Sequence, residues 1–397
     1  MASKFEFESS PWPNGWMGGQ YSVLRALLGA CLFVHFVRLS VWFWGLDTFG
    51  LPLAVTIGAA AASLFFAVGL AARWAALCLC IALAGLYGLD PLLPGQGLTY
   101  LGWMLLAHVL MRKTPYGSVA VRGRPDPGGG WRMPGAVLLV SWLLLGFSYL
   151  DSALFLKFGP DLEGSEYLGP FLLDPFAREY FPHDFLASLP AFLVESLFVA
   201  AVFIGHMFLV LGYLLRRVRP WFWSVVVLVQ ICIVFLLDFA VAPVAMLLFH
   251  LFAIDPGWFR SRKLPERATL FYDGTCALCH RLARFVLAED AAESITFSPL
   301  QSDYFRSALT SEERTGLPDS IVLKSDDGLL LEGDAVIRIL KMLGGLWLAL
   351  GLVLSVFPRR WRNAAYHYVG DRRYRLFGHT ETACPVVPEL LRTRFRE

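Results

Sequence analysis

The sequence has little charge: Asp, Glu, Lys and Arg make up 17% of its 397 residues, where a soluble domain carries roughly 25%. The shortfall lies before residue 256, where apolar runs dominate, and the chain from residue 266 onward reads as a soluble protein apart from one apolar stretch. A net charge of +2 gives no basic excess for a nucleic-acid partner. The composition therefore predicts an integral membrane protein with a soluble C-terminal third.

Signs of a secreted protein are also absent. Residues 1–20 carry one basic residue, and the first apolar run is too long for the core of a signal peptide, so we expect no cleavable signal. The seven cysteines do not form the dense framework of a small disulfide-stapled domain. Four of them lie in apolar runs, where small buried hydrophobes are expected: Cys31, Cys78, Cys80 and Cys232.

Eight apolar runs are candidates for helices that cross a bilayer, which takes about 20 residues. They cover residues 21–45, 51–70, 74–90, 97–111, 132–155, 188–214, 221–238 and 240–255. Backbone hydrogen bonds must be satisfied inside lipid, so a helical bundle is the expected state. The lipid bilayer is thus a predicted partner of the chain.

Basic residues predict how the bundle is oriented. They cluster after the second, fourth, sixth and eighth runs: Arg73; Arg112, Lys113, Arg122, Arg124 and Arg132; Arg216, Arg217 and Arg219; and Arg260, Arg262 and Lys263. The loop of residues 157–187 is acidic instead. Because Lys and Arg favour the cytoplasmic side, we expect both termini in the cytoplasm, with a bacterial inner membrane as the location.

The polar third opens with a strand that leads into a helix. Residues 268–272 (ATLFY) read as a buried strand that ends at the turn pair Asp273-Gly274. Cys276 and Cys279 follow, and apolar residues then recur at helical spacing. A CxxC pair at the start of a helix, directly after a strand, is the setting of a redox-active dithiol.

The helix N-terminus favours a thiolate at Cys276, because its unpaired N–H groups and the helix dipole stabilise negative charge. Cys276 is therefore the expected nucleophile. Cys279, one turn further on, can attack a mixed disulfide at Cys276 and release the partner. The predicted partner is a protein or small-molecule disulfide, and this exchange requires no cofactor or metal.

The remaining pattern predicts an α/β thioredoxin-like domain over residues 261–397, after a membrane domain over residues 1–260. Strands are expected at 294–298, 320–324 and 329–331, the last two as a hairpin, and a helix at 334–343. Residues 344–357 are apolar but short for a span, so a packed or membrane-surface helix is expected. Pro318 is either a cis-proline against the CxxC pair or an ordinary loop proline.

Several motifs of this third fall in one order along the chain: Tyr272-Asp273-Gly274 with Cys276 and Cys279, Pro299–Ser302, Glu332–Ala335, Tyr366 and Arg373–Gly378. Together, over residues 268–388, they resemble the DCC family of thiol-disulfide oxidoreductases. The resemblance implies a thioredoxin-like fold and thiol–disulfide exchange. It also implies that Asp273 shapes the loop or accepts a proton from Cys279, the alternative being a plain turn residue.

Other chemistries fit the same cysteines less well. Cys276 to His280 spells CxxCH, the pattern of c-type haem attachment, but the cytoplasmic side and the preceding strand argue against haem. Zinc needs four ligands, and only His280 and Cys384 are candidates beyond the pair. Cys384 is either a third redox thiol or an exposed bystander.

The membrane region from residue 15 to 260 resembles the HTTM domain, which is related to vitamin K-dependent gamma-carboxylases. The segment Ser148–Gly159 carries this resemblance, which implies that Lys157 acts as a base toward a reduced quinone. An interfacial lysine is the alternative. Ionisable residues inside the runs are candidates for a polar pocket that binds a membrane quinone or lipid headgroup, or for structural hydrogen bonds: His35, Arg38, His108, Glu195, His206 and His250.

Three functions remain open on the sequence alone. The first is a membrane-anchored thiol-disulfide oxidoreductase of the protein-disulfide reductase type. The second is a carboxylase-like, quinone-dependent membrane enzyme whose reductant is the dithiol domain. The third is a non-enzymatic scaffold or transporter that carries a redox-sensing domain.

Overall fold

The computed structural model describes residues 14–47, 49–89, 98–158, 217–236, 242–259, 267–315, 320–380 and 387–397, together with isolated residues 185, 188–190, 192, 193, 196, 215, 317 and 385. For residues 149–158 the description covers the backbone. The chain forms two compact units. The first comprises residues 1–13, 24–112 and 134–254, and the second comprises residues 14–23, 113–133 and 255–397. The second unit thus takes in chain from both sides of the predicted boundary at residue 260.

The first unit is helical, as its apolar runs predict. Its helices are α2 (Gly18–Gly45), whose residues 18–23 belong to the second unit, α3 (Leu51–Val68), α4 (Ala72–Leu89), α5 (Leu98–Leu110), α6 (Gly135–Phe158), α10 (Arg219–Leu236) and α11 (Ala242–Ala253). Among the described residues, α2, α3 and α4 are long and apolar enough to cross a membrane. The stretches 100–110, 135–148, 219–232 and 244–253 are shorter apolar helices. The predicted run at 188–214 lies almost entirely outside the described residues.

Close helix packing in this unit depends on small residues and on tryptophan hydrogen bonds. A Cβ atom built on Gly29 of α2 would lie 2.6 Å from the Cβ atom of Ala67 in α3, so only glycine allows this approach. The indole Nε1 of Trp103 donates to Ser141 Oγ at 2.8 Å and joins α5 to α6. Trp223 Nε1 donates to the His250 carbonyl at 2.9 Å and joins α10 to α11.

The second unit contains a four-stranded mixed sheet in the order β2-β1-β3-β4. Its strands are β1 (Ala268–Tyr272), β2 (Ile295–Pro299), β3 (Val322–Ser325) and β4 (Gly328–Leu331). β1 pairs with β2 in parallel and with β3 antiparallel, and β3 pairs with β4 as a hairpin. All four predicted strands are present, with ends that shift by two residues or fewer.

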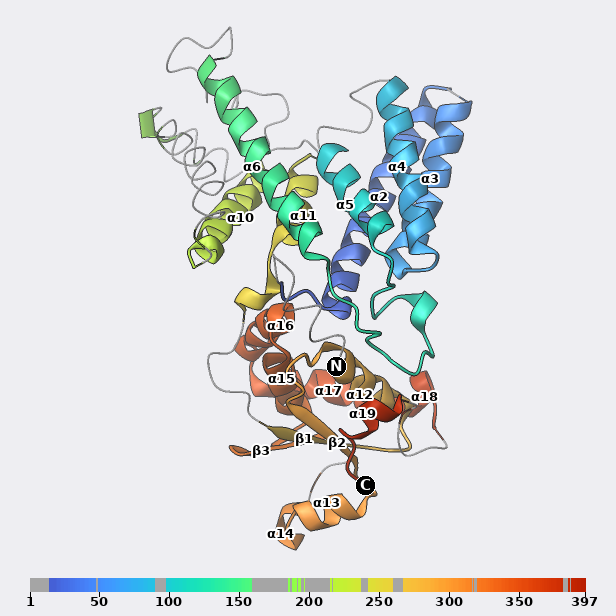
Figure 1. The fold of residues 1–397 in the computed structure, drawn as a ribbon, viewed down its shortest axis with the longest axis vertical. Helices are drawn as coiled ribbons and strands as arrows, with labels where there is room; N and C mark the ends of the chain where they lie inside the picture. The colour runs from blue at the N-terminus through green and yellow to red at the C-terminus, as the bar shows by residue number, and fades with distance from the viewer. Residues whose placement is uncertain are drawn as a thin grey trace. The chain divides into compact units, whose positions relative to one another are not determined.

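Both faces of the sheet are covered by helices. On one face, α12 (Ala277–Glu289) and α15 (Glu332–Leu343) bury a core that includes Leu270, Val286 and Leu323. On the other, the short helices α13 (Asp303–Ala308) and α14 (Ser311–Arg314) flank a smaller cluster around Phe271. Figure 1 shows these two groups of helices on opposite sides of the strands. Neighbouring residues of β1 point to opposite faces, as strand geometry requires.

Four helices complete the second unit: α16 (Gly345–Val356), α17 (Arg359–Gly370), α18 (Arg373–Phe377) and α19 (Glu389–Arg392). α16 confirms the helix predicted for residues 344–357, which at 12 residues is shorter than a membrane span. The sequence patterns did not predict the other three. α17 packs against α15, and α18 packs against α12.

The fully buried carboxylate of Glu289, at the end of α12, joins three segments of this unit. Its oxygens accept hydrogen bonds from the backbone N–H of Gly19 at 2.7 Å and from the indole Nε1 of Trp347 in α16 at 2.7 Å. Burial raises the pKa of Glu289, and these hydrogen bonds together with the charge of Arg132 oppose that rise. The N-terminal residues 14–23 are thus an integral part of the second unit.

The C-terminal residues protect the edge of the sheet at β2. Phe297 donates its N–H to the Arg394 carbonyl and accepts from the N–H of Arg396, each at 2.8 Å. The buried Arg394 guanidinium pairs with the Asp290 carboxylate at 2.5 Å and donates to the Ile295 carbonyl. A sheet edge is a template for aggregation unless it is covered, and these residues cover it.

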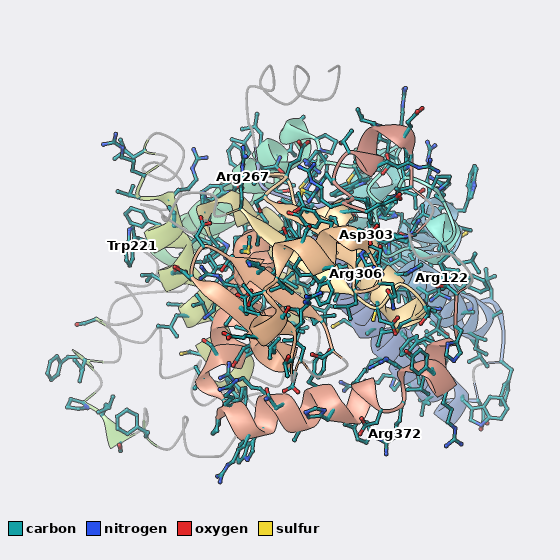
Figure 2. The ribbon with its side chains drawn as sticks, turned by 90° about the horizontal axis from the view of Figure 1, so that it is seen from below. Arg122, Trp221, Arg267, Asp303, Arg306 and Arg372 are labelled. Carbon is teal, nitrogen blue, oxygen red and sulfur yellow. The ribbon has the colours of Figure 1, made fainter. Side chains whose placement is uncertain are left out.

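We predict that Arg394→Gln lowers the free energy of unfolding of this unit by about 3–5 kcal/mol, because it leaves the Asp290 carboxylate buried without its partner. Urea unfolding, followed through the alkylation of Cys276, measures the effect. The control is Arg306→Gln, which breaks the exposed ion pair with Asp303 at 3.1 Å (Figure 2) and should cost about 1 kcal/mol or less. Equal losses in the two variants would contradict the prediction.

Candidate active site

The dithiol sits where the central strand β1 turns into α12. β1 ends at Tyr272, a short turn follows, and Cys276 is the N-cap residue of α12 with an extended backbone (φ −97°). The Sγ atom of Cys276 accepts a hydrogen bond from the backbone N–H of Cys279 at 3.4 Å. The first sulfur therefore lies among the free N–H groups of the helix, where negative charge is stabilised.

The two thiols, neither of them in a disulfide, have different surroundings. Cys276 has no exposed surface, whereas Cys279 is 9% exposed. Burial raises the pKa of Cys279 well above its ordinary value, and the neighbouring Cys276 sulfur and Asp273 carboxylate add to the rise. Cys279 therefore stays protonated at neutral pH.

Asp273 lies between β1 and the dithiol and organises the turn. Its Oδ1 accepts hydrogen bonds from Thr275 N at 2.9 Å, Thr275 Oγ1 at 2.8 Å and Gln301 Nε2 at 3.1 Å. Its Oδ2 accepts from the hydroxyl of Tyr374 and faces the Arg373 guanidinium at 3.7 Å. These donors surround a carboxylate that is 6% exposed.

Two effects act on the pKa of Asp273. Burial raises it, but the hydrogen bonds from Tyr374, Thr275 and Gln301 outweigh burial and hold the pKa below its ordinary value. A depressed pKa means that this group stabilises the fold fully above the unfolded pKa of about 3.9. The contribution is lost as the pH falls through the folded pKa. Because both pKa values lie well below 7, Asp273 is a carboxylate at neutral pH.

A covering segment, residues 373–380, lies over Cys276. Ala277 donates its N–H to the Gly378 carbonyl at 3.3 Å, and Thr380 donates its N–H to the Thr275 carbonyl at 2.9 Å. An isolated β-bridge pairs Cys276 with His379. The full burial of Cys276 follows from this segment, which hydrogen bonds attach to the loop on both sides of the cysteine.

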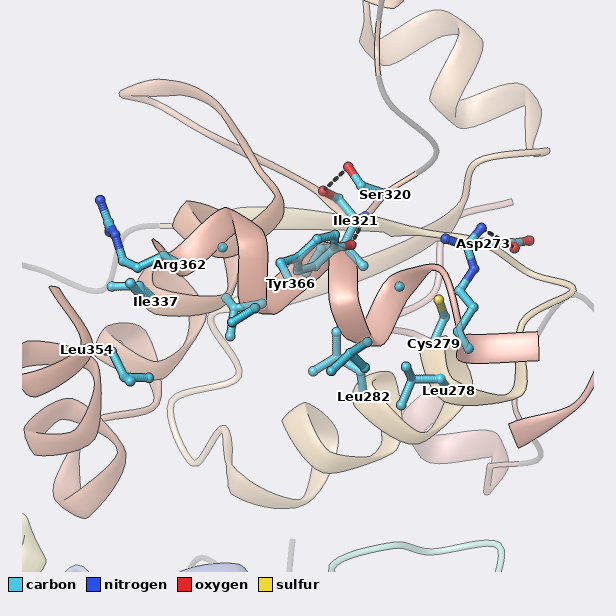
Figure 3. Close-up of a pocket in the computed structure, with 16 residues that line it drawn as sticks. Asp273, Leu278, Cys279, Leu282, Ser320, Ile321, Ile337, Leu354, Arg362 and Tyr366 are labelled. Carbon is cyan, nitrogen blue, oxygen red and sulfur yellow. Dashed lines mark hydrogen bonds and ion pairs between the residues drawn. The ribbon is translucent and has the colours of Figure 1, made fainter. Parts of the chain in front are cut away.

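A cavity of about 380 Å³ opens beside Cys279. Its walls come from α12, α15, α16, α17 and the two residues before β3, and nearly all of the lining is carbon. Figure 3 shows Cys279 and Asp273 at one end of the cavity and Leu354 and Arg362 at the other. Cys279, but not Cys276, is among the lining residues.

The wall formed by α17 is held in place by polar contacts from the start of α15. Glu332 accepts a hydrogen bond from Asn363 Nδ2 at 2.6 Å and lies 3.1 Å from His367 Nε2. Asp334 pairs with Arg362 at 2.9 Å. Gly333 lies between these carboxylates, and a Cβ atom there would come within 3.1 Å of Asn363. The segment Glu332–Ala335 therefore positions the cavity wall.

His280 turns toward the loop. Its Nε2 lies 2.9 Å from the Gly274 carbonyl oxygen, and its ring packs edge-on against Tyr272. Within the described part of the chain, no group of three or more His, Cys, Asp or Glu residues could hold a metal ion. Cys384, the other candidate ligand, and Pro318 lie outside the described residues.

The ionisable residues of the apolar runs, predicted as candidates for a polar pocket, separate into two groups. His35 and Arg38 both line a cavity of about 300 Å³ in the first unit, with Leu101 and Ala245 opposite. His108 packs edge-on against Phe66, and His250 Nδ1 lies 2.7 Å from the Met246 carbonyl oxygen; neither lines that cavity. Lys157 falls in the last turn of α6, where the backbone alone is described, and Glu195 and His206 lie outside the described residues.

Several residues of the site were not identified as such from the sequence. Tyr374 and Arg373 approach Asp273 from α18, and Gln301 approaches it from the turn after β2. Tyr366 accepts a hydrogen bond from the Ile321 N–H at 3.1 Å. All four stand in the motifs that carry the family resemblance, so recurring motifs were the available signal for them.

Comparison with known proteins assigns a family to this part of the chain. Residues 270–379 match the family model described as DCC1-like thiol-disulfide oxidoreductase. The chain is 31% identical over 139 residues to the uncharacterized protein YuxK of Bacillus subtilis, a match that covers 34% of this chain and 97% of YuxK. It is also 31% identical over 120 residues to the Arabidopsis thaliana chloroplastic DCC family protein At1g52590. This match covers 30% of this chain and 69% of that protein. No solved structure matches the chain.

We predict that Tyr374→Phe makes Cys276 easier to alkylate, because the variant loses the hydrogen bond from the covering segment to Asp273. Hydrogen bonds to charged groups contribute roughly 1.5–3 kcal/mol, so the alkylation rate should rise about tenfold or more. Mass spectrometry of the peptide that contains Cys276 gives the rate. Tyr368→Phe, on an exposed residue of α17, is the control and should leave the rate unchanged. An unchanged rate in Tyr374→Phe would mean that Asp273 does not hold the cover.

Proposed function

The chain belongs to the DCC family, and from this premise we propose that it is a thiol-disulfide oxidoreductase that works through Cys276 and Cys279. The observation that carries the proposal is the place of Cys276 as the N-cap of α12, with its sulfur hydrogen-bonded to the N–H of Cys279. The N-terminus of a helix offers N–H donors to an attacking sulfur, so this place suits the nucleophile of a dithiol. The sheet order β2-β1-β3-β4 supports a thioredoxin-like fold, as does α12, which connects the parallel strands β1 and β2 along the chain.

In the reducing direction, the Cys276 thiolate attacks one sulfur of a substrate disulfide. A mixed disulfide forms and the first substrate thiol leaves. Cys279 then loses its proton and attacks the Cys276 sulfur, which releases the second substrate thiol and leaves the protein disulfide. Two electrons pass from the dithiol to the substrate. The raised pKa of Cys279 suits this order, because the resolving thiol stays protonated until the mixed disulfide has formed.

Asp273 acts in this proposal through the shape of the loop. Its carboxylate is engaged by Thr275, Gln301 and Tyr374, and these contacts position Cys276 at the start of α12. The alternative, a direct transfer of the Cys279 proton to Asp273, is weakened by the same hydrogen bonds, because they lower the basicity of the carboxylate. Asp273 is thus a positioning residue.

The apolar helices supply the membrane anchor in this proposal. α2, α3 and α4 are long enough to cross a bilayer. We propose that the other apolar runs complete an HTTM-like domain of eight spans with both termini in the cytoplasm of a bacterial inner membrane. The basic loops around Arg112 and Arg217 support this orientation.

A second candidate function concerns the membrane region alone. The cavity lined by His35 and Arg38 brings two polar side chains to a site among apolar residues, which suits a membrane quinone or a lipid headgroup. In this alternative the dithiol domain supplies electrons to a carboxylase-like enzyme with Lys157 as its base. Lys157→Ala would then abolish the membrane activity and leave thiol exchange unaffected.

We predict a reversible two-electron redox transition of the purified chain that Cys276→Ser abolishes. Thiols are counted by an alkylation gel shift across a glutathione redox series, and the midpoint gives the direction of exchange. Cys78→Ser removes an exposed cysteine of α4 and should leave the transition intact. If both thiols stay reduced throughout the series, the oxidoreductase proposal is wrong and the pair has a structural role.

A further inference from the structure

The cavity beside Cys279 is built for an apolar group. Its lining includes Leu278 and Leu282 of α12, Val336 and Ile337 of α15, and Val369 of α17. Its volume of about 380 Å³ falls in the range of small-ligand pockets, roughly 300–1,000 Å³. Protein interiors are otherwise close-packed, so an apolar space of this size beside the resolving thiol is a candidate binding site.

The charged groups of the lining are paired within the protein. Arg362 pairs with Asp334 at 2.9 Å, and Arg373 faces Asp273 at 3.7 Å. Tyr366 accepts the N–H of Ile321, and the Ser320 hydroxyl donates to the Ile321 carbonyl. The two arginine charges are therefore balanced by two carboxylates. Nearly all of the lining is carbon, and Arg362, whose Nε has no hydrogen-bond partner among the described residues, lies at the end of the cavity away from Cys279 (Figure 3). An ionic ligand beside Cys279 would therefore lose its water without a compensating partner, which is costly.

We propose that the cavity selects the substrate: it binds a neutral, apolar group that is attached directly to the disulfide to be reduced. This inference rests on the proposed function and adds the chemical class of its substrate. With that group between α12 and α17, the disulfide lies at the end of the cavity that Figure 3 shows next to Asp273 and Cys279. The attacking sulfur of Cys276 is adjacent to this end, because it accepts the N–H of Cys279 at 3.4 Å. The group is supplied either by a small organic disulfide or by an apolar side chain next to a substrate cysteine.

The reaction balances without any further reactant. The protein dithiol and the disulfide RSSR give the protein disulfide and two RSH, so one S–S bond breaks, one forms, and two electrons move to the substrate. Each thiolate that leaves takes up one of the two protons released by Cys276 and Cys279. The first half of the reaction leaves one R group joined to the protein, and the cavity holds that group until the second thiol attacks.

A matched pair of aromatic disulfides tests the selection in the full-length chain. Dipyridyl disulfide is neutral, and bis(nitrobenzoate) disulfide carries two negative charges. The readout is the rate of modification of the peptide that contains Cys276 and Cys279, resolved by mass spectrometry after an acid quench, so the other cysteines do not contribute. Each rate is divided by the rate of the same reagent with a small free thiol. The neutral reagent should be favoured by about tenfold or more, because a buried unpaired charge is costly.

Val369→Lys probes the cavity, and Leu390→Lys is the matched control. Val369 lines the cavity and is 43% exposed, so the variant should fold; Leu390 is 79% exposed on α19, outside the cavity. We expect the preference for the neutral reagent to fall at least about fivefold in Val369→Lys, because an ammonium at the cavity wall attracts the anionic reagent and disfavours an apolar group. The preference should persist in Leu390→Lys. Both variants are measured in the same detergent. Partition of a reagent into micelles therefore changes its rate equally in the two variants and does not affect the comparison.

The outcomes separate the two proposals. An unchanged preference in Val369→Lys would overturn the cavity as the substrate site and leave the oxidoreductase function standing. No modification of the dithiol by either reagent, in a protein that keeps its fold, would overturn both. Short peptide disulfides that differ in one residue beside the cysteine, Leu against Asp, then tell a protein substrate from a small molecule. A preference for Leu would assign the cavity to an apolar side chain, and equal rates would assign it to a small organic disulfide.

Discussion

The carboxylate of Asp273 joins three segments of the candidate active site. It accepts hydrogen bonds from the loop through Thr275, from the turn after β2 through Gln301 and from the covering segment through Tyr374. A charge in a buried place is tolerated only when its partners are complete. The position of Cys276 and the position of the segment that covers it are therefore coupled through one group, and a change on either side affects the other.

The same part of the chain combines a covered nucleophile with an open cavity. α17 is held to α15 by the contacts of Glu332 and Asp334, which lie at one edge of the helix pair. Glu332 has a positive φ of 53°, a conformation that costs free energy for any residue with a side chain. In an ordinary core, apolar packing between two helices supplies the stability. Here polar contacts at the edge hold α15 and α17 together and an apolar cavity separates them. The helix pair is therefore less stable than a packed one, and the cavity lies beside the dithiol.

Local patterns were enough to predict the elements that carry the cysteines. The strand at 268–272 was predicted at its observed ends, and the hairpin expected at 320–324 and 329–331 lies within two residues of its predicted ends. The covering segment was not predictable from local patterns. Tyr374 and Asp273 are about a hundred residues apart in the sequence, and a periodic pattern of apolar residues carries no information on a single long-range contact. In the first unit, helical spacing brought His35 and Arg38 to one cavity. The His108 ring packs against Phe66 of α3 instead, and His250 lies within hydrogen-bond distance of the Met246 carbonyl in its own helix. Composition predicted apolar helices there, and three of them reach the length of a span among the described residues.

The contact between Glu289 and the backbone of Gly19 has a consequence for the order of biosynthesis. A ribosome makes the chain from its N-terminus, so residues 14–23 emerge before α3 and every later helix, while Glu289 and Trp347 emerge after α11. The early segment must wait for its partners while the whole apolar region is translated. The second unit therefore closes only when translation is nearly complete, and a nascent chain whose apolar helices are still emerging has no finished dithiol site.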